Sequence, residues 1–385
     1  MLNHSLLEKE FPFLSGEIFL NSAYVTVPPV RTQQAYHNFM DQLVASYADD
    51  LITATAPIVA QARARLAELI GASPSEIGFV KNTSEGIGIL SQGLNYRPGD
   101  NVVVIDQEHS ANLFGWIKLQ QRGVELRVAR SRDDAVLLED IVALIDEHTR
   151  VISVSAVQFA TGFAIDLQAL GDICKERGVL LSVDGIQALG RLSVDVKRMN
   201  ISYLTAGGNK GLFGILGIGF VYCRTDLLEQ ITPPYASYQS IISSHRQPAI
   251  TTDFSMLPWR LDAGRLESGN LNLAGIAALN AGTSLILELG VEEIQRHILS
   301  LEKTLRKGLE GISLRVVTPG GEKNRSGVIC VYYPQEKETP VIELLKSRHI
   351  HTTMRGGYIR MSLHAFNTST DVDHVVAALW DISRL

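Results

Sequence analysis

The sequence has few cysteines, no large excess of charge of one sign and no long apolar run. Its 385 residues include only three cysteines, a number that excludes a domain built on disulfides. The three cysteines are scattered and do not have the spacing of metal ligands. Lys and Arg number 35 and Asp and Glu number 41, and this net charge of −6 argues against a protein that grips nucleic acid. The most apolar window, residues 214–223, is too short and too rich in glycine to span a bilayer. We therefore expect neither nucleic-acid nor membrane partners.

The composition indicates a globular protein of one large or two medium domains, with 45% hydrophobic residues to form its core. The first ten residues mix charges with leucines and show no apolar stretch ahead of a cleavage site. Together with the sparse cysteines, this pattern predicts a cytoplasmic location.

Short apolar runs alternate with amphipathic stretches from about residue 60 to residue 225. Near-continuous apolar strands separated by helices predict an α/β fold with a mostly parallel sheet covered by helices. Ligands of such sheets bind at the carboxyl ends of the strands, so the residues that follow each strand are the candidate site. The pattern predicts strands at 102–106, 124–129, 151–155, 179–184, 201–206 and 217–223, and helices at 112–121, 138–147 and 167–177.

The chain changes character after residue 225. Residues 226–260 contain four prolines and many serines, which predicts a long loop on the substrate side. We divide the chain into an N-terminal arm (1–15), a large domain (16–260) and a smaller C-terminal α+β domain (261–385). In the last part the pattern predicts helices at 273–289, 293–309, 340–347 and 370–382, and strands at 314–317, 327–333 and 358–362.

Two predicted strand ends carry an acid and an amine. Asp184 ends the strand at 179–184, and Lys210 follows the strand at 201–206 among glycines. One interpretation is an ordinary salt bridge. The other is a pyridoxal phosphate site, which needs a lysine for the Schiff base and an acid that keeps the pyridine nitrogen protonated. Residues 81–86 precede a helical stretch, where hydroxyls and free amides suit a phosphate, although they also suit a simple helix cap.

Seven short motifs along the chain carry a family resemblance. They are Phe19-Leu-Asn-Ser-Ala23, Asn82-Thr-Ser-Glu-Gly86, Glu108-His-Ser-Ala-Asn112, Asp184-Gly-Ile-Gln-Ala-Leu-Gly190, Asn209-Lys210, Arg265-Leu-Glu-Ser-Gly-Asn-Leu-Asn272 and Arg360-Met-Ser-Leu-His-Ala-Phe-Asn-Thr368. Together they resemble the class V aminotransferase family of fold type I pyridoxal-phosphate enzymes, which includes cysteine desulfurases and isopenicillin-N-epimerase-like proteins. The resemblance covers nearly the whole chain.

The resemblance implies a role for each matching residue near the cofactor ring. Lys210 would form the Schiff base and later move the substrate proton, and Asp184 would pair with the pyridine nitrogen. Gln187 would contact the ring hydroxyl. His109 would stack on the ring, unless it is an ordinary surface histidine.

The resemblance also implies contacts to the cofactor phosphate. Thr83 and Ser84 would hold this phosphate at the start of the helix. Asn270 falls where the family usually has a threonine that reaches the phosphate of the partner subunit, which implies a homodimer with shared sites. Asn209 stands where the family often has a histidine, so Asn209 would have to replace it or leave the phosphate held more weakly.

The resemblance places the substrate against the C-terminal part of the chain. Arg360 would bind the α-carboxylate, for which a planar bidentate donor is suited. Arg355 is a second candidate, or else a solvated surface arginine, and Tyr24 would line the pocket over the ring.

Two further departures from the family pattern bear on the reaction. Phe159 stands where desulfurases keep an asparagine near the ring hydroxyl, which changes the surroundings of the ring. Cysteine desulfurases carry a nucleophilic cysteine on a loop ahead of the carboxylate-binding arginine, but residues 351–360 contain none. Because persulfide chemistry needs a thiolate on a mobile loop, a true cysteine desulfurase is disfavoured, and we expect the three cysteines to be buried.

These residues predict an enzyme that binds an amino acid as an external aldimine on pyridoxal phosphate and removes its Cα proton with Lys210. The expected reaction is transamination or C–S lysis. Epimerisation is an alternative, with Tyr24, His109 or Tyr358 as the second acid or base, and so is a catalytically silent family member. A nicotinamide-dependent dehydrogenase is a weaker alternative, because the glycines at 214–219 precede a predicted strand rather than a helix.

Overall fold

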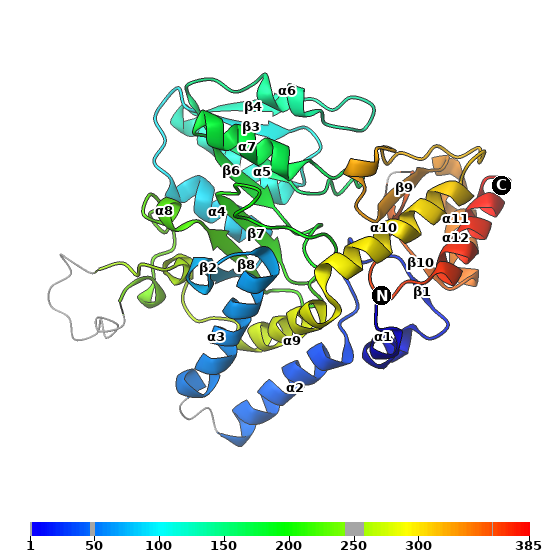
Figure 1. The fold of residues 1–385 in the computed structure, drawn as a ribbon, viewed down its shortest axis with the longest axis horizontal. Coiled ribbons are helices and arrows are strands. Elements are labelled where there is room, and N and C mark those ends of the chain that lie inside the picture. The colour runs from blue at the N-terminus through cyan, green and yellow to red at the C-terminus, as the bar shows by residue number, and fades with distance from the viewer. Residues whose placement is uncertain (1, 47–50, 243–257, 356) are drawn as a thin grey trace.

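A mostly parallel sheet forms the centre of the computed structural model, which describes residues 2–46, 51–242, 258–355 and 357–385 (Figure 1). Among these residues the sheet has seven strands in the order β2-β8-β7-β6-β5-β3-β4. Strands β7, β6, β5, β3 and β4 run parallel, whereas β8 is antiparallel to both of its neighbours, β7 and β2. Their bounds are β2 (Ile77–Val80), β3 (Asn101–Ile105), β4 (Glu125–Ala129), β5 (Thr149–Ser155), β6 (Leu180–Asp184), β7 (Tyr203–Gly207) and β8 (Gly219–Cys223).

Apolar side chains cover both faces of this sheet. Along β3, Val102 and Val104 belong to one buried cluster and Val103 and Ile105 to another, because successive strand residues point to opposite faces. The first cluster includes apolar residues of α4 (Thr83–Gly93) and α5 (Ser110–Ile117), and the second includes those of α7 (Leu167–Arg177). Helices α6 (Leu138–Val142) and α8 (Thr225–Leu228) complete this part of the chain. The predicted doubly covered α/β sheet is confirmed.

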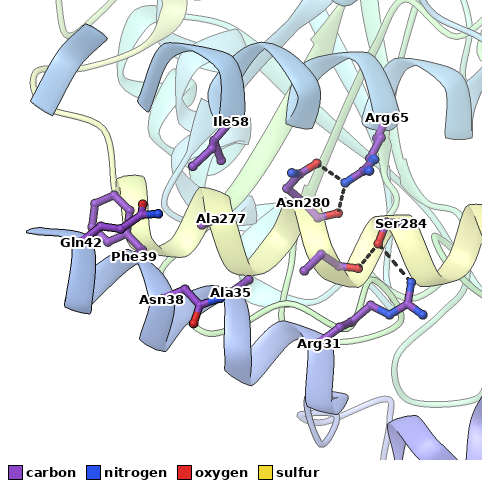
Figure 2. Close-up of a pocket in the computed structure, with 11 residues that line it drawn as sticks. Arg31, Ala35, Asn38, Phe39, Gln42, Ile58, Arg65, Ala277, Asn280 and Ser284 are labelled. Carbon is purple, nitrogen blue, oxygen red and sulfur yellow. Dashed lines mark hydrogen bonds between the residues drawn. The ribbon is translucent and has the colours of Figure 1, made fainter. Parts of the chain in front are cut away.

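Three long helices pack together below the sheet in Figure 1: α2 (Val30–Ala45), α3 (Leu51–Ile70) and α9 (Leu273–Leu289). They enclose a pocket of about 420 Å³ with Arg31 and Arg65 toward one end and Phe39 and Ile58 toward the other (Figure 2). No single described helix is long and apolar enough to cross a bilayer. Helix α9 meets that requirement only jointly with the next helix, and the pair bends by 75°.

Among the residues described beyond 290, a three-stranded antiparallel sheet in the order β11-β12-β9 and three α-helices form the C-terminal part. The N-terminal segment reaches this part, because β1 (Ile18–Phe19) pairs in parallel with β10 (Ile350–His351). The division at residue 261 stays a prediction, and the packing places α9 with α2 and α3. The remaining bounds are α1 (His4–Glu10), β9 (Val328–Tyr332), β11 (Thr353–Arg355), β12 (Tyr358–Ser362), α10 (Val291–Gly308), α11 (Glu338–Ser347) and α12 (Ser369–Ile382).

Two predicted elements are wrong. The predicted strand at 314–317 reduces to a single bridge between Val316 and Val331 with two backbone hydrogen bonds beside it. The ladder does not continue, because the Cys330 N–H donates to Thr318 Oγ1 rather than to a backbone carbonyl. The helix predicted at 138–147 ends at residue 142, because residues 143–148 form turns that lead into β5. Of the loop predicted at 226–260, residues 243–257 lie outside the described residues.

Candidate active site

Asp184 and Lys210 lie at the carboxyl ends of the neighbouring strands β6 and β7. Asp184 is the last residue of β6 and pairs with Thr205 of β7 in the strand register. Lys210 follows the end of β7 by three residues. The Asp184 side chain is buried and accepts a hydrogen bond from the backbone N–H of Ile186 at 3.0 Å. The two predicted strand ends therefore meet at one edge of the sheet, where an α/β sheet binds its ligands.

Burial shifts the pKa values of Asp184 and Lys210 in opposite directions. Loss of water raises the pKa of Asp184, and the nearby charge of Glu108 adds to this effect. Loss of water lowers the pKa of Lys210, and the cations Arg360, Arg191 and Arg355 lower it further, while Asp184 opposes them. Titratable groups shifted in this way by burial and by charged neighbours are typical of functional sites.

The N-terminus of α4 lies beside the same strand edge. Asn82 caps this helix by accepting a hydrogen bond from the N–H of Glu85 at 3.0 Å. Thr83 is buried, and its hydroxyl has no hydrogen-bond partner among the described residues, whereas Ser84 is exposed. Gly86 lets the helix approach β7, since a Cβ at this position would come within 2.0 Å of Thr205 Oγ1. The free amides of a helix N-terminus are suited to a phosphate group.

His109 caps the N-terminus of α5 and is half-buried rather than a surface residue. Its Nδ1 accepts a hydrogen bond from the N–H of Ala111 at 3.1 Å, which leaves the proton on Nε2. Burial lowers the pKa of His109, as do the charges of Lys210 and Arg355, so the ring is neutral near neutral pH. The ring of Phe159 stands edge-on to it, with 4.9 Å between ring centroids and 89° between planes.

Glu108 is a buried acid that the sequence reasoning did not single out. Its carboxylate accepts hydrogen bonds from Ser155 N and Oγ at 2.7 and 2.5 Å, and from Asn112 Nδ2 at 2.9 Å. Burial raises the pKa of Glu108, and these donors oppose the rise. Glu108 thereby ties the segment that carries His109 to the end of β5. Glu108 precedes the cap of α5, so no helical spacing in the sequence indicates its contact with Asn112.

Arg360 of β12 faces the large sheet from the C-terminal part. Its Nη1 donates to the carbonyl of Phe159 at 2.8 Å and its Nη2 to Thr353 Oγ1 at 3.4 Å. Its Nε is buried and has no partner among the described residues. Burial lowers the pKa of Arg360 to about 10. Arg355 is exposed, and its guanidinium lies 5.7 Å from the ring centroid of Phe159.

Gln187 is held from two sides. Its Nε2 donates to the carbonyl of Ala23 at 3.0 Å, and its Oε1 accepts from Arg191 Nη2 at 3.2 Å. Arg191 is fully buried, and burial lowers its pKa to about 9. No sequence pattern singled out Arg191, because a buried arginine that binds amide oxygens has the same sequence appearance as an exposed one.

Three predicted residues lie at the margins of this cluster. The backbone carbonyl of Asn209 accepts from Thr26 N at 3.0 Å, which ties the N-terminal segment to the Lys210 turn. Tyr24 is 54% exposed. Asn270 is exposed, accepts from the Tyr238 hydroxyl at 2.7 Å and lines a cavity of about 410 Å³ beside the start of α4. The roles predicted for these three residues stay predictions.

The polar atoms without partners match what a phosphorylated pyridine aldehyde and an amino acid would bring. The Thr83 hydroxyl could donate to a phosphate oxygen, and Arg360 Nε to a carboxylate. A protonated ring nitrogen would satisfy the buried carboxylate of Asp184. The described residues therefore fit pyridoxal phosphate.

Comparison with known proteins decides the family. The chain matches the family described as Aminotransferase class-V over residues 18–375. It belongs to this class-V aminotransferase family. A probable cysteine desulfurase from Methanothermobacter thermautotrophicus is 28% identical over 98% of this chain and 98% of its own length. A cysteine desulfurase from Salmonella typhimurium is 29% identical over 98% and 97% of the two chains.

Solved structures show the same fold for this class-V protein. The apo structure of a cysteine desulfurase from Thermococcus onnurineus NA1 has a TM-score of 0.89 at 23% identity and covers 100% of this chain and 98% of its own. A cystine C-S lyase in complex with its reaction product, cysteine persulfide, has a TM-score of 0.86 at 21% identity and covers 97% and 99%. The class-V protein therefore has the fold type I architecture and is a pyridoxal-phosphate enzyme.

Proposed function

We propose that this enzyme removes the Cα proton of an amino acid with Lys210 and then cleaves a C–S bond, with transfer of the amino group as the second candidate. When bound, pyridoxal phosphate supplies a ring that takes up the electron pair left at Cα. The observation that carries the proposal is the position of Asp184 and Lys210 at the carboxyl ends of the neighbouring strands β6 and β7, where the charges of Asp184 and Arg360 both act on the pKa of Lys210.

Lys210 has the properties of a base that works near neutral pH. Burial lowers the pKa of Lys210 and so favours the neutral amine, and a neutral Nζ can accept a proton from Cα and return it. Asp184 is fixed at the end of β6 by the N–H of Ile186, so its carboxylate can hold a protonated ring nitrogen in one place.

Arg360 and His109 would orient the reactants. The guanidinium of Arg360 is anchored through Nη1 to the Phe159 carbonyl and through one Nη2 proton to Thr353 Oγ1, which leaves Nε–H and the other Nη2 proton for a bidentate carboxylate contact. The neutral imidazole of His109 is fixed by its contact with Ala111 N and would present a flat face to the cofactor ring.

The cysteines favour C–S lysis over a desulfurase reaction. Cysteine desulfurases transfer sulfur to a protein thiolate, whereas all three thiols here are buried and burial raises their pKa values. Cys330 lies opposite Arg360 in the strand register, but its Sγ donates to the Ala160 carbonyl at 3.1 Å. The residues just before Arg360 form a short hairpin of β11 and β12 without cysteine.

A product assay tests this proposal. The holoenzyme is incubated with L-cysteine or L-cystine, and sulfide, pyruvate, ammonia and alanine are measured. C–S lysis of L-cysteine with water gives sulfide, pyruvate and ammonia in equal amounts, and Lys210→Ala should abolish all three. Formation of alanine with a protein-bound persulfide would instead establish a desulfurase. Consumption of an added keto acid without sulfide would establish transamination.

We also propose that the enzyme is a cytoplasmic homodimer with shared sites. Asn270 is exposed where it lines the cavity beside the start of α4, and this position would let its side chain face a second subunit. This exposure supports the homodimer. Light scattering gives the mass in solution. A monomer that retains full activity would contradict the shared site.

A further inference from the structure

The segment after β5 is held by the C-terminal part of the chain through one backbone carbonyl after another. We call residues 159–164 the clasped segment. Five of its six carbonyl oxygens accept a hydrogen bond from a side chain beyond residue 300. The pairs are Phe159 with Arg360 (2.8 Å), Ala160 with Cys330 (3.1 Å), Thr161 with Thr318, Gly162 with Ser326 (2.7 Å) and Ala164 with Asn324 (2.8 Å).

Other hydrogen bonds fix the side chains that donate to the clasped segment. Thr318 Oγ1 accepts from Cys330 N at 2.8 Å, so its only proton points to the Thr161 carbonyl. Ser326 Oγ is oriented in the same way by Val328 N at 3.2 Å. A side chain at Gly162 would not fit, because its Cβ would come within 2.3 Å of the Val328 carbonyl. The clasped segment therefore lies directly on β9.

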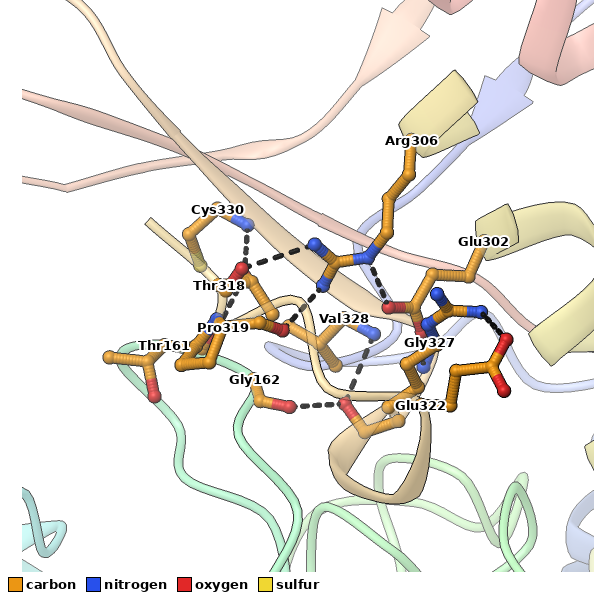
Figure 3. A network of polar contacts seen from close by, with 12 residues as sticks. Thr161, Gly162, Glu302, Arg306, Thr318, Pro319, Glu322, Gly327, Val328 and Cys330 are labelled. Atoms are coloured by element: carbon orange, nitrogen blue, oxygen red, sulfur yellow. Dashed lines mark hydrogen bonds and ion pairs between the residues drawn. The ribbon is translucent and has the colours of Figure 1, made fainter. Parts of the chain in front are cut away.

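A buried ion pair holds the Thr318 side of this contact (Figure 3). Arg306 Nε binds Glu302 Oε1 at 2.9 Å, while its two Nη atoms donate to the carbonyls of Thr318 and Pro319 at 3.1 and 3.0 Å. Glu302 is fully buried and also accepts from Gly327 N at 2.7 Å. All three guanidinium nitrogens of Arg306 and both carboxylate oxygens of Glu302 are thus engaged, which makes the support rigid.

The clasped segment contacts two groups of the proposed active site through Phe159. The Phe159 carbonyl holds Arg360 Nη1, and the Phe159 ring stands against His109. A displacement of the segment would therefore rotate the guanidinium that faces the substrate and loosen the imidazole that faces the cofactor.

We propose that Thr318 and Ser326 are positioning residues that keep the free edge of Arg360 directed at the substrate carboxylate. They act through the clasped segment and touch neither substrate nor cofactor. This inference rests on the proposed role of Arg360.

The test uses the holoenzyme with glycine and methylamine as probes, two amines that differ by the carboxylate. Their dissociation constants are read from the change in cofactor absorption. The dissociation constant of methylamine divided by that of glycine measures what the carboxylate contributes to binding. Thr318→Val should lower this ratio about tenfold, because a shift of Arg360 by about 1 Å weakens a bidentate contact strongly. Thr318→Ser should restore the ratio, and Thr304→Val, an exposed threonine of α10, should leave it unchanged.

A second measurement does not depend on the cofactor. Hydrogen–deuterium exchange of the apoprotein should be faster at residues 159–164 in Thr318→Val and unchanged in Thr304→Val. Ser326→Ala serves as the second variant and should act in the same direction if Thr318→Val does not fold.

The outcomes distinguish a failure of the proposed positioning role from a failure of the proposed role of Arg360. If Arg360→Lys abolishes the carboxylate preference of the wild type but neither Thr318→Val nor Ser326→Ala changes it, the positioning role is overturned and the role of Arg360 stands. If the wild type shows no carboxylate preference, the role of Arg360 is overturned, and the positioning role with it.

Discussion

Replacing Gly86 with alanine tests whether α4 must lie directly on β7. A Cβ at this position would come within 2.0 Å of Thr205 Oγ1, 2.7 Å of Thr205 Cβ and 3.0 Å of Val221 Cγ1. Because ordinary contacts between such atoms begin near 3.4 Å, the helix has to move away from β7 by about 1 Å. The buried Tyr203 hydroxyl, which donates to the Gly86 carbonyl at 2.7 Å, would lose good geometry at the same time.

The expected loss follows from opposing contributions. Overpacking costs about 1–3 kcal/mol, a strained buried hydrogen bond costs about 1 kcal/mol, and alanine returns about 1 kcal/mol of helix propensity. The free energy of unfolding of Gly86→Ala should therefore be about 2 kcal/mol below that of the wild type, measured by urea unfolding of the apoprotein. Cofactor affinity should fall about tenfold, because the displaced turn carries Thr83.

Gly88 provides a matched control on the same helix. A Cβ at Gly88 meets nothing within 4 Å, so Gly88→Ala should gain about 1 kcal/mol from helix propensity alone. Equal unfolding free energies for Gly86→Ala and Gly88→Ala would refute the close packing of α4 on β7.

Two further predictions concern buried titratable groups. His364 accepts at Nδ1 from Ala365 N (2.7 Å) and donates from Nε2 to the Gly211 carbonyl (3.1 Å), which requires a neutral ring, and burial lowers its pKa to about 3. An unfolded histidine binds a proton near pH 6.5, so the unfolding free energy should fall as the pH drops from 6.5 to 3, by up to about 1.4 kcal/mol per unit. His364→Gln should flatten this slope in urea titrations, and an unchanged slope would contradict it. The three buried thiols should react with a disulfide reagent only after denaturation, and a fast native reaction would contradict their burial.

Much of the sheet could be predicted from the sequence. Strands expected at 102–106, 151–155 and 179–184 correspond to β3, β5 and β6 to within two residues, because a strand buried on both faces is a continuous apolar run. The antiparallel direction of β8 could not be predicted, since a buried strand has the same apolar pattern in either direction. Helix α9 matches its predicted range, 273–289, because its apolar residues continue to the glycine that follows it.

The site was predictable only where a residue follows a strand or matches a family motif. Lys210 and Asp184 meet both conditions, and the structure brings them together. The support for Arg360 could not be predicted, because its partner is the backbone carbonyl of Phe159, which any residue would supply. Thr318 and Ser326 also donate to backbone carbonyls, so in the sequence they look like ordinary surface polar residues.

Mass spectrometry after borohydride reduction of the holoenzyme tests the central claim most directly. Reduction converts the Schiff base between the cofactor and its lysine into a stable bond, and proteolysis then locates the label. We predict a phosphopyridoxyl group on Lys210, whose pKa is lowered by burial at the end of β7. A label on any other lysine, or no label after addition of the cofactor, would contradict the account.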